Sequence, residues 1–321
     1  MSPTEVLERI PRGALRLERT LAGAVVLLPC AGVVAALVWA GRHGVSRTDI
    51  GLAGGMYLLT GFGITVGYHR LLTHGSFRCP RWVRAGLAIA GSMALQGPVV
   101  RWVADHRRHH AHSDRPGDPH SPQPGAHAEA GARRVQLWHA HVGWLFAPGK
   151  TRLRRFAPDL LQDADIARID RLYAVWALAS LGLPAVLGGL LSGTNQGAWS
   201  GLLWGGLVRI FLVHHVTWSI NSLCHSVGQR PFVTRDASTN NAWLALPSLG
   251  ESWHNAHHAF PTSARHGLGQ FAIDPSARLI WVLEKLHLAW DVRRPSAEHI
   301  EARRAPATPS ASAPSKERDL A

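Results

Sequence analysis

Cysteine is scarce in this sequence: three cysteines occur in 321 residues, and no two of them form a C-x-x-C pair. Disulfide frameworks and thiolate metal sites need paired or evenly numbered cysteines, so neither is expected. The H-E-x-x-H string of zinc hydrolases, the C-x-x-C-H string of haem attachment and the G-x-G-x-x-G nucleotide loop are also missing. These absences argue against the classes of protein that the motifs define.

Acidic residues are outnumbered by basic ones, which gives the chain a net charge of +13. A high positive charge is common among nucleic-acid-binding proteins, but no binding motif of that class accompanies it here, so nucleic acid is not an expected partner. The basic residues gather in the central part of the chain, between residues 101 and 171. Because loops rich in lysine and arginine stay on the cytoplasmic side of a membrane, we expect this part and both termini to be cytoplasmic.

Apolar residues are concentrated in five runs rather than spread along the chain. The runs cover residues 21–40, 50–68, 83–100, 172–191 and 199–220. Four of them approach or reach the roughly 20 residues that a helix needs to cross a bilayer. Buried helices of a soluble protein are the alternative, but uncharged runs of this length favour the membrane. The first run has no clear cleavage site behind it, which predicts a retained span rather than a signal peptide.

Nine of the twenty histidines occur in short clusters, in the strings HRLLTH, HRRHH, NSLCH and HNAHH. They are His69, His74, His106, His109, His110, His225, His254, His257 and His258. The second and fourth strings share the spacing H-x-x-H-H, which places three imidazoles on one face of a helix. Nine imidazoles are more ligands than one ion can take, so the sequence predicts a dinuclear, histidine-rich metal site.

Imidazole suits zinc, copper, iron and nickel. A closed structural zinc site takes four ligands and favours cysteine, which disfavours that interpretation. Two iron ions with open positions would fit a site that activates O2. The soluble di-iron bundles use Glu and Glu-x-x-His, and this chain lacks that arrangement. The clusters therefore indicate a histidine-built di-iron site placed at a membrane surface.

The clusters can share one site only if they lie on the same side of the membrane. The run at residues 83–100 would separate the first cluster from the second if it crossed. It begins with Arg81 and Arg84 and is interrupted by small and polar residues, so we expect it to lie in the interface. The predicted fold is an all-α integral membrane protein, with four transmembrane helices under a helical cytoplasmic cap that holds the di-iron site. Residues 1–20 are expected to be a cytoplasmic lead-in, and residues 293–321 a disordered tail.

The strings GFGITVGYHRLLTH, WVADHRRHHAHSD, NSLCH and GESWHNAHHAFP, in this order, resemble the membrane-bound fatty acid desaturases, and specifically the acyl-CoA (stearoyl-CoA type, delta-9) branch. The resemblance covers residues 50–292 and marks residues 21–292 as a desaturase domain. It implies O2-dependent removal of two hydrogens from a saturated acyl-CoA of about C16–C18, which gives a cis-monounsaturated product in unsaturated fatty acid biosynthesis.

The resemblance also implies a division of the ligands between two irons. His69, His74, His106, His110 and His258 would hold one iron, and His109, His225, His254 and His257 the other, with Asn221 acting through a water. Trp218 matches a tryptophan that lines the acyl tunnel of the family.

Other site residues are expected from their chemistry and position. Arg152, Arg154 and Arg155 are candidates for binding the phosphates of CoA, although a basic run beside a membrane often reflects orientation or contact with anionic lipid. Asp105, Asp118 and Glu251 are candidates for orienting ligand imidazoles, with a solvated or capping role as the alternative. His120 and His141 lie in the family-like strings DPHSP and HVGW and are expected just behind the ligands.

Electrons are expected from a separate donor, a ferredoxin or similar protein with its reductase, because the sequence contains no haem or flavin motif. An acyl-lipid desaturase and a di-iron membrane hydroxylase would use the same clusters. A histidine-rich metal transporter would instead carry ionisable residues within its spans, and the four runs are expected to contain essentially none.

Overall fold

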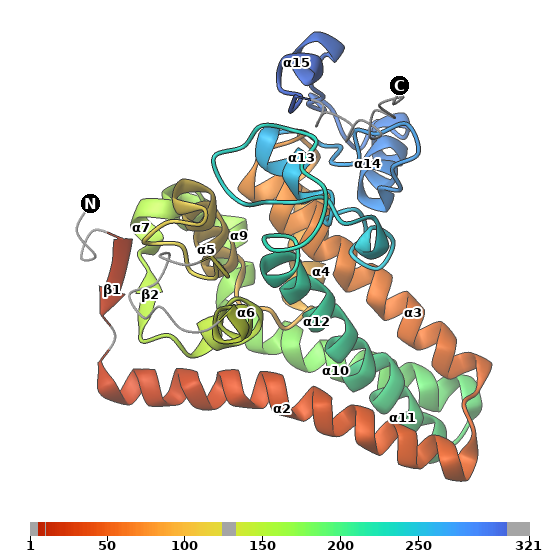
Figure 1. Cartoon of the computed structure of the whole chain (residues 1–321). Helices are drawn as coiled ribbons and strands as arrows, with labels where there is room; N and C mark the ends of the chain where they lie inside the picture. Colours follow the sequence, from red (N-terminus) through yellow and green to blue (C-terminus); the bar gives the residue numbers. More distant parts are fainter. Residues whose placement is uncertain (1–5, 10, 124–132, 307–321) are drawn as a thin grey trace, which may run out of the picture.

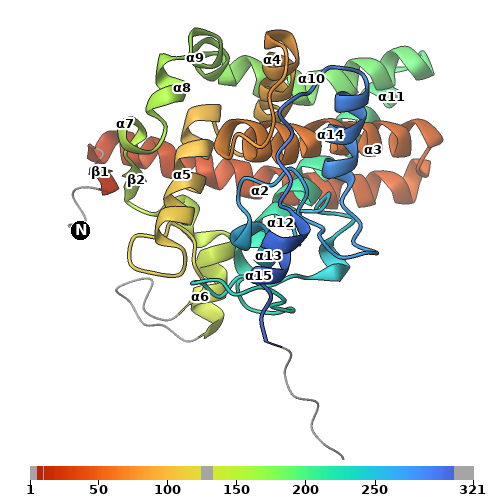
Figure 2. The same ribbon diagram turned by 90° about the horizontal axis from the view of Figure 1, so that it is seen from above.

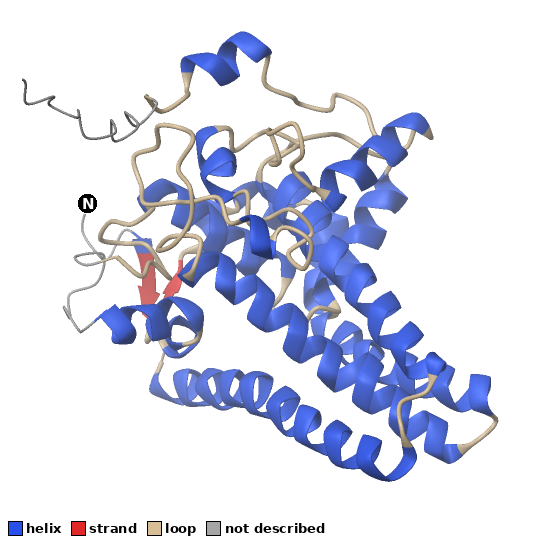
Figure 3. Cartoon of the chain, turned by 45° about the vertical axis from the view of Figure 1, so that its right-hand side comes forward, coloured by secondary structure: helices blue, strands red, loops and turns tan. Residues whose placement is uncertain are grey.

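Helices make up nearly all of the regular structure in this computed structural model, which describes residues 6–9, 11–123 and 133–306 (Figure 1 and Figure 3). One exception is a short antiparallel pair of strands, β1 (Leu7–Arg9) and β2 (Gly149–Thr151). This pair corrects the all-α prediction in a small way. It ties the N-terminal segment to the middle of the chain, a long-range contact that no local pattern in the sequence announces.

Three helical segments are long and apolar enough to cross a membrane, namely Arg12–His43, Arg47–Thr73 and Tyr173–Ser192. The first is α2, the second joins α3 (Arg47–Phe62) to the π-helical segment η1 (Gly63–Thr73), and the third is α10. The sequence predicted the first span at residues 21–40, but α2 begins nine residues earlier, at Arg12. The chain is therefore an integral membrane protein with several candidate spans.

The fourth predicted span, residues 199–220, falls in a helical stretch made of α11 (Asn195–Gly201), the π-helical η3 (Leu202–Val208) and α12 (Arg209–Ser222). It is not among the three candidate spans of the described residues, because Arg209 and His214 lower its hydropathy. Since η3 packs against α2, α3 and α10 at once, these polar residues face protein rather than lipid. Its crossing stays a prediction, which this central position supports.

Glycines allow α10 to lie very close to the helical stretch formed by α11, η3 and α12. A Cβ on Gly201 would be 2.2 Å from the Pro184 carbonyl oxygen, and one on Gly188 would be 2.2 Å from the Gly197 carbonyl oxygen. Small residues four apart are the usual device for close helix contact in a membrane, where packing replaces the hydrophobic effect as the driving force.

A cap of shorter elements covers one end of the long helices (Figure 1 and Figure 2). Its first half is α4 (Arg81–Ser92), α5 (Val99–His112), α6 (Arg133–His141), the 3-10 turn η2 (Gly143–Phe146), α7 (Leu153–Phe156), α8 (Pro158–Gln162) and α9 (Ala164–Arg171). Its second half is the 3-10 turn η4 (Ala242–Leu244), α13 (His254–Ala259), α14 (Pro275–Lys285) and α15 (Ala297–Ala302). The largest cluster of buried apolar side chains lies where η1, α4 and α5 meet.

Helix α4 occupies more than half of the apolar run at residues 83–100. At about 1.5 Å per residue its 12 residues are roughly 18 Å long, against roughly 30 Å for the hydrocarbon core of a bilayer. The interfacial placement of this run stays a prediction, and the short helix supports it. η1 packs on α4 with almost no space between their backbones, since a Cβ on Gly63 would be 2.2 Å from the Gly91 nitrogen.

The prediction of a disordered tail at residues 293–321 is wrong for the first part of that segment. Helix α15 follows Ser296, whose side chain accepts a hydrogen bond from the His299 amide. The segment after it pairs with the loop beyond α12, because the Val233 amide donates to Arg303 O at 2.9 Å and the Ala305 amide to Pro231 O at 2.8 Å. Residues 307–321 lie outside the described part of the chain.

Candidate metal centre

The nine clustered histidines come from four segments that meet at the end of the helical bundle. η1 contributes His69 and is followed by His74, α5 carries the second cluster, His225 follows α12, and α13 carries the last cluster. The π-helical form of η1 explains the five-residue spacing of HRLLTH. In a π-helix residues five apart lie on one face, and the His74 amide bonds the His69 carbonyl at 3.2 Å. The rings of this pair have centroids 4.9 Å apart.

The nine imidazoles separate into two groups. Within each group the ligand atoms all lie within 4.8 Å of one another. The first group is His69, His74, His106, His110 and His257, and the second is His109, His225, His254 and His258. The ligand division implied by the family resemblance is therefore wrong at two positions, since His257 and His258 exchange places. The helical geometry of α13 gives the reason. Residues four apart stack along a helix face, so His258 joins His254, while His257 turns toward His110.

Contacts between ring nitrogens indicate that a cation belongs in each group. His254 Nε2 lies 3.0 Å from His225 Nε2 and 3.1 Å from His258 Nε2. Asp114 and Asp236 accept the Nδ1 hydrogens of His225 and His258, which leaves both Nε2 atoms as bare acceptors when these rings are neutral. Because His254 Nε2 can donate one hydrogen at most, at least one of the two contacts would bring lone pairs together.

A metal ion removes this conflict. With imidazole–metal bonds of roughly 2.1 Å, ligand nitrogens at a right angle are about 3.0 Å apart and tetrahedral ones about 3.4 Å apart. The first group has the same spacing, with His257 Nε2 at 2.9 Å from His110 Nε2 and 3.1 Å from His69 Nε2. The residues fit two metal ions, as is typical of a di-metal site.

Carboxylates orient four of the ligand rings. Among the candidates from the sequence, Glu251 contacts His69 Nδ1 and Asp118 accepts from His109 Nδ1 at 3.0 Å. Two more were missed, namely Asp114, 2.8 Å from His225 Nδ1, and Asp236, 2.7 Å from His258 Nδ1. Such partners fix the tautomer of a ligand and raise its basicity. The string HSD after the second cluster pointed to Asp114, but no local signal pointed to Asp236.

Asp105 does not have the predicted role. Its carboxylate accepts a hydrogen bond from the Thr151 hydroxyl and has Arg101, Arg108 and Lys150 as its charged neighbours. No hydrogen bond or ion pair joins it to a ligand histidine in the described structure. It is on α5 one residue before His106, but one step along a helix turns a side chain by about 100°, away from the ligand face.

The two histidines that were expected just behind the ligands, His120 and His141, differ in position. His120 lies behind the second group as predicted, with its ring centroid 4.5 Å from that of His109 and its Nδ1 3.9 Å from Asp118. His141 instead bonds the Ser222 hydroxyl and His215, each at 3.0 Å, and belongs to neither group. A residue that the sequence did not single out, His266, has its ring centroid 4.4 Å from that of His257 and accepts a hydrogen bond from Arg70.

Burial keeps most of the ligands ready to bind a metal. It lowers the pKa of His74, His106, His110 and His257 well below the ordinary value, and neighbouring imidazoles lower it further. Burial also lowers the pKa of His258 to about 4, although Asp236 opposes the effect. His109 differs, because burial lowers its pKa but the charge and hydrogen bond of Asp118, with Asp114 and Asp236 nearby, together outweigh burial and raise it. Neutral imidazoles are the form that binds metal.

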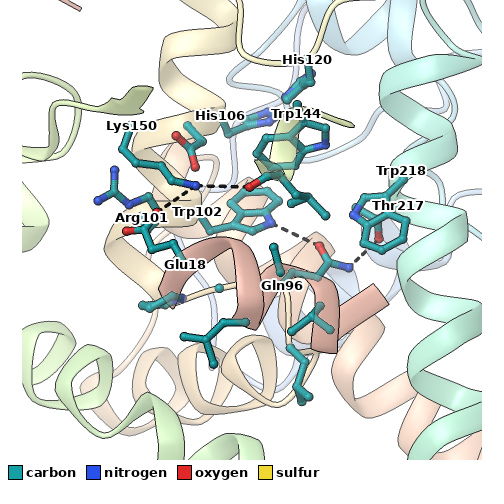
Figure 4. A pocket seen from close by; sticks show the side chains of 18 of the residues that line it. Glu18, Gln96, Arg101, Trp102, His106, His120, Trp144, Lys150, Thr217 and Trp218 are labelled. Atoms are coloured by element: carbon teal, nitrogen blue, oxygen red, sulfur yellow. Dashed lines mark hydrogen bonds and ion pairs between the residues drawn. The ribbon is translucent and has the colours of Figure 1, made fainter. Parts of the chain in front are cut away.

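A cavity of about 470 Å³ leads to the first group (Figure 4). His106, His120, Trp218 and Asn221 are among its lining residues, so the predicted Trp218 and Asn221 share a cavity with a histidine of the first group. A second, smaller cavity of about 50 Å³ is lined by His69, His106, His254 and Asn221 and thus touches both groups. Asn221 lines both cavities.

The outer part of the large cavity carries two basic residues that sequence reasoning missed, Arg101 and Lys150, together with Glu18 (Figure 4). Lys150 Nζ lies 3.1 Å from Glu18 Oε2. The predicted Arg152, Arg154 and Arg155 do not line the cavity. They are exposed side chains at α7, where the chain turns away from β2.

A chain of hydrogen bonds crosses the inner half of the cavity wall. The Trp102 indole donates to Gln96 Oε1 at 3.3 Å, and Gln96 Nε2 donates to Thr217 Oγ1 at 2.9 Å (Figure 4). The rest of the wall is mostly apolar, and three of its residues, Leu21, Ala22 and Val25, belong to the membrane helix α2. The cavity therefore suits a long apolar chain that enters from a more polar end.

The fold and the site together define a membrane protein with buried histidine groups that are typical of a di-metal site. The sequence model of the fatty acid desaturase family matches residues 48–278, which is well over half of the chain. The chain belongs to this family, whose members desaturate fatty acids with O2.

Similar proteins extend over most of the chain. A hex-5-enoyl-[acyl-carrier protein] acetylenase of Moorena producens is 46% identical over 280 residues, 87% of each protein. An sn-1 stearoyl-lipid 9-desaturase of Anabaena variabilis is 38% identical over 251 residues, 77% of this chain and 85% of the relative. Delta-9 acyl-lipid desaturase 1 of Arabidopsis thaliana is 40% identical over 245 residues, 75% of this chain and 74% of the relative. These relatives are named for lipid- or carrier-bound substrates, and the acyl-CoA branch expected from the sequence is not established for this chain.

Proposed function

We propose that this protein is a di-iron acyl-lipid desaturase, which converts one saturated carbon–carbon bond of a fatty acyl chain in a membrane lipid to a cis double bond. Two hydrogens leave adjacent methylenes, and O2 is reduced to two waters with two electrons and two protons from outside. The observation that carries the proposal is the cavity, which connects His106 of the first histidine group with a wall formed by the membrane helix α2.

The nine histidines would hold the two irons in the two groups that the structure forms, with Asn221 placed to reach one of them through a water. When bound, the irons supply the activation of O2. The protein orients four of the ligand imidazoles through Glu251, Asp114, Asp118 and Asp236, and it positions the acyl chain against the centre.

The substrate carrier is inferred from the outer part of the cavity. Leu21, Ala22 and Val25 place one wall on a helix that also faces the bilayer, which gives an acyl tail a short path from lipid. Arg101 and Lys150 are accompanied there by Glu18 and Asp105, so this part has too little positive charge for the several phosphates of CoA and suits a single phosphate-bearing headgroup better. By analogy with the stearoyl-lipid relative, we also propose an acyl chain of C16–C18 and a double bond near its middle.

We place the centre and both termini on the cytoplasmic side, because the basic residues gather there. Electrons would come from a ferredoxin or similar protein with its reductase, which would dock on this basic face. Turnover with reduced ferredoxin should fall as salt is raised if this is right, and salt-independent turnover would contradict it.

Expression in a host without its own desaturase tests the function. Total fatty acids should gain a cis-monoene that is lost in His106→Ala and His254→Ala variants. Purified protein in lipid nanodiscs, with reduced ferredoxin, should then be offered stearoyl chains on phospholipid, on CoA or on acyl-carrier protein. Product from the phospholipid alone supports the proposal, whereas product from the thioesters alone refutes the lipid substrate. Hydroxylated chains would make the protein a hydroxylase.

A second function is favoured by the relative from Moorena producens, which acts as a hex-5-enoyl-[acyl-carrier protein] acetylenase. An acetylenase removes two more hydrogens from an existing double bond and leaves a triple bond. The same nanodisc assay with an alkenoyl-carrier-protein substrate distinguishes the two, because an alkyne can be detected by azide coupling. A coupled product from this substrate, with none from phospholipid, would favour the acetylenase.

A further inference from the structure

An arginine is buried in the fourth predicted span, where the apolar sequence pattern predicts essentially no ionisable residue. Arg209 begins α12 and has a relative exposure of 0%. Within the described part of the chain its guanidinium has no carboxylate partner, and it donates to backbone carbonyls and a hydroxyl instead. The expectation of spans without ionisable residues is therefore wrong. An ionisable residue at such a position is costly and usually has a function.

The guanidinium satisfies carbonyl groups that the helices leave open. Arg209 Nε donates to Gly205 O at 3.0 Å, and one terminal nitrogen donates to Ser180 O at 2.9 Å. Ser180 O lies four residues before Pro184, which has no amide hydrogen to complete the helical bond. The arginine thus replaces a hydrogen bond that the proline removes from α10.

The same side chain also reaches the turn that follows α4. Its other terminal nitrogen donates to Met93 O at 3.1 Å, and the Ser180 hydroxyl donates to the same oxygen at 2.5 Å. His214 Nε2 donates to the next carbonyl, Ala94 O, at 2.8 Å. Three side chains from α10 and α12 therefore hold two successive carbonyls. A positive charge at this place is also favoured by the C-terminal end of the α4 dipole.

The residues that follow these carbonyls form the inner wall of the large cavity. Leu95 has a φ of 57°, in the left-handed region that a leucine rarely adopts. Gln96 and Gly97 come next, and all three line the cavity. Gln96 makes the hydrogen bonds to Thr217 and Trp102 described above. A strained backbone of this kind persists only where its surroundings fix it.

We propose that Arg209, with Ser180 and His214, sets the position of the double bond by clamping the turn at Met93–Leu95. The clamp does not touch the substrate. It acts through Gln96, whose position determines how far an acyl chain can enter and which methylenes then face the metal centre. Arg209, Ser180 and His214 are positioning residues in this proposal, which rests on the proposed desaturase function.

Ser180→Ala is the mildest test, because it removes the hydroxyl that donates to Met93 O and accepts from Arg209, while the arginine keeps its three carbonyl partners. Ser200→Ala is a matched control, since Ser200 is also a buried serine near the same helix contact but its hydroxyl has no hydrogen-bond partner among the described residues. Arg209→Lys keeps a charge but loses the fork of donors. Bound iron and the position of the double bond, located by mass spectrometry of disulfide adducts, are measured for each.

Ser180→Ala and Arg209→Lys should keep their iron and raise the share of displaced positional isomers at least about tenfold over the wild type, because each removes two or more hydrogen bonds of the clamp. Ser200→Ala should match the wild type. Variants that bind iron, turn over and give the wild-type isomer alone would overturn the proposal. A wild-type protein without any monoene product would instead count against the desaturase function.

A second readout does not need turnover. A phospholipid whose acyl chain ends in a diazirine should cross-link to one narrow set of residues in the wild type and in Ser200→Ala. In Ser180→Ala the labelling should spread over several neighbouring residues, because the inner wall has loosened. The same narrow labelling in Ser180→Ala and wild type would overturn the clamp even if the reaction catalysed were a different one.

Discussion

Replacing Asp236 by asparagine should weaken metal binding at the second histidine group, although Asp236 itself would not touch the metal. The carboxylate accepts the Nδ1 hydrogen of His258 at 2.7 Å, and its other oxygen accepts from the Ser238 amide at 3.0 Å. Asparagine can keep the bond to Ser238, but its amide group would then face His258 Nδ1 with hydrogens. The ring must turn away or move its own hydrogen to Nε2, the atom that faces the group.

Both responses remove a ligand nitrogen from the metal. Loss of such an orienting partner typically lowers metal affinity about 10- to 100-fold, equivalent to roughly 1.4–2.7 kcal/mol. Asp105→Asn is the matched control. Asp105 is also a half-buried aspartate beside a histidine cluster, but it bonds Thr151 rather than a ligand, so its replacement should change the affinity by less than about twofold.

The assay is a competition titration of Fe(II) against a chelator with purified protein in detergent. Total iron at saturation and the secondary structure by circular dichroism show whether each variant is folded. The reasoning is refuted if Asp105→Asn weakens binding as much as Asp236→Asn does, because contact with the ligand ring would then not be the cause. Unchanged affinity in Asp236→Asn would refute it as well.

Three further outcomes follow from particular contacts. The iron-free protein should lose thermal stability as the pH falls from about 6.5 toward 4. Burial lowers the pKa of His258 to about 4, so over this range the unfolded chain binds more protons than the folded one. A melting temperature that rises as the pH falls would contradict this lowering of the pKa. Gly63→Ala should destabilise the fold by about 3 kcal/mol or more, since its Cβ would meet the α4 backbone, whereas Gly54→Ala, which has open space, should be neutral or slightly stabilising in the same thermal denaturation. Lys150→Ala should raise KM about five- to tenfold for a substrate with an anionic headgroup, while Arg154→Ala leaves KM unchanged. A raised KM in Arg154→Ala and an unchanged one in Lys150→Ala would instead favour the headgroup arginines predicted from the sequence.

Local spacing finds most of the clustered histidines. H-x-x-H-H on a helix turns three rings to one face whatever the rest of the chain does, so this spacing singles out six of the nine, and HRLLTH adds His69 and His74. His225 stands alone in NSLCH, and it was included because this string belongs to the family resemblance. Three of the four expected spans are equally readable, because a membrane helix needs apolar residues along its whole length. Even so, the π-helical turn that brings His74 beside His69 is not written in the hydropathy.

The remaining features depend on segments far apart in sequence. The exchange of His257 and His258 between the groups, and the partnership of Asp236 with His258, are set by how α13 faces α5 and the loop beyond α12. Arg209 lowers the apolarity of its own helix, yet it completes the hydrogen bonds of α10 and of the turn after α4. The sequence by itself determined which groups can bind metal and where the chain can cross a membrane, since both are properties of short segments. Only the tertiary structure decided which ligands share an ion, which carboxylates hold them and what shapes the acyl cavity, because each of these is a contact between side chains that the fold alone brings together.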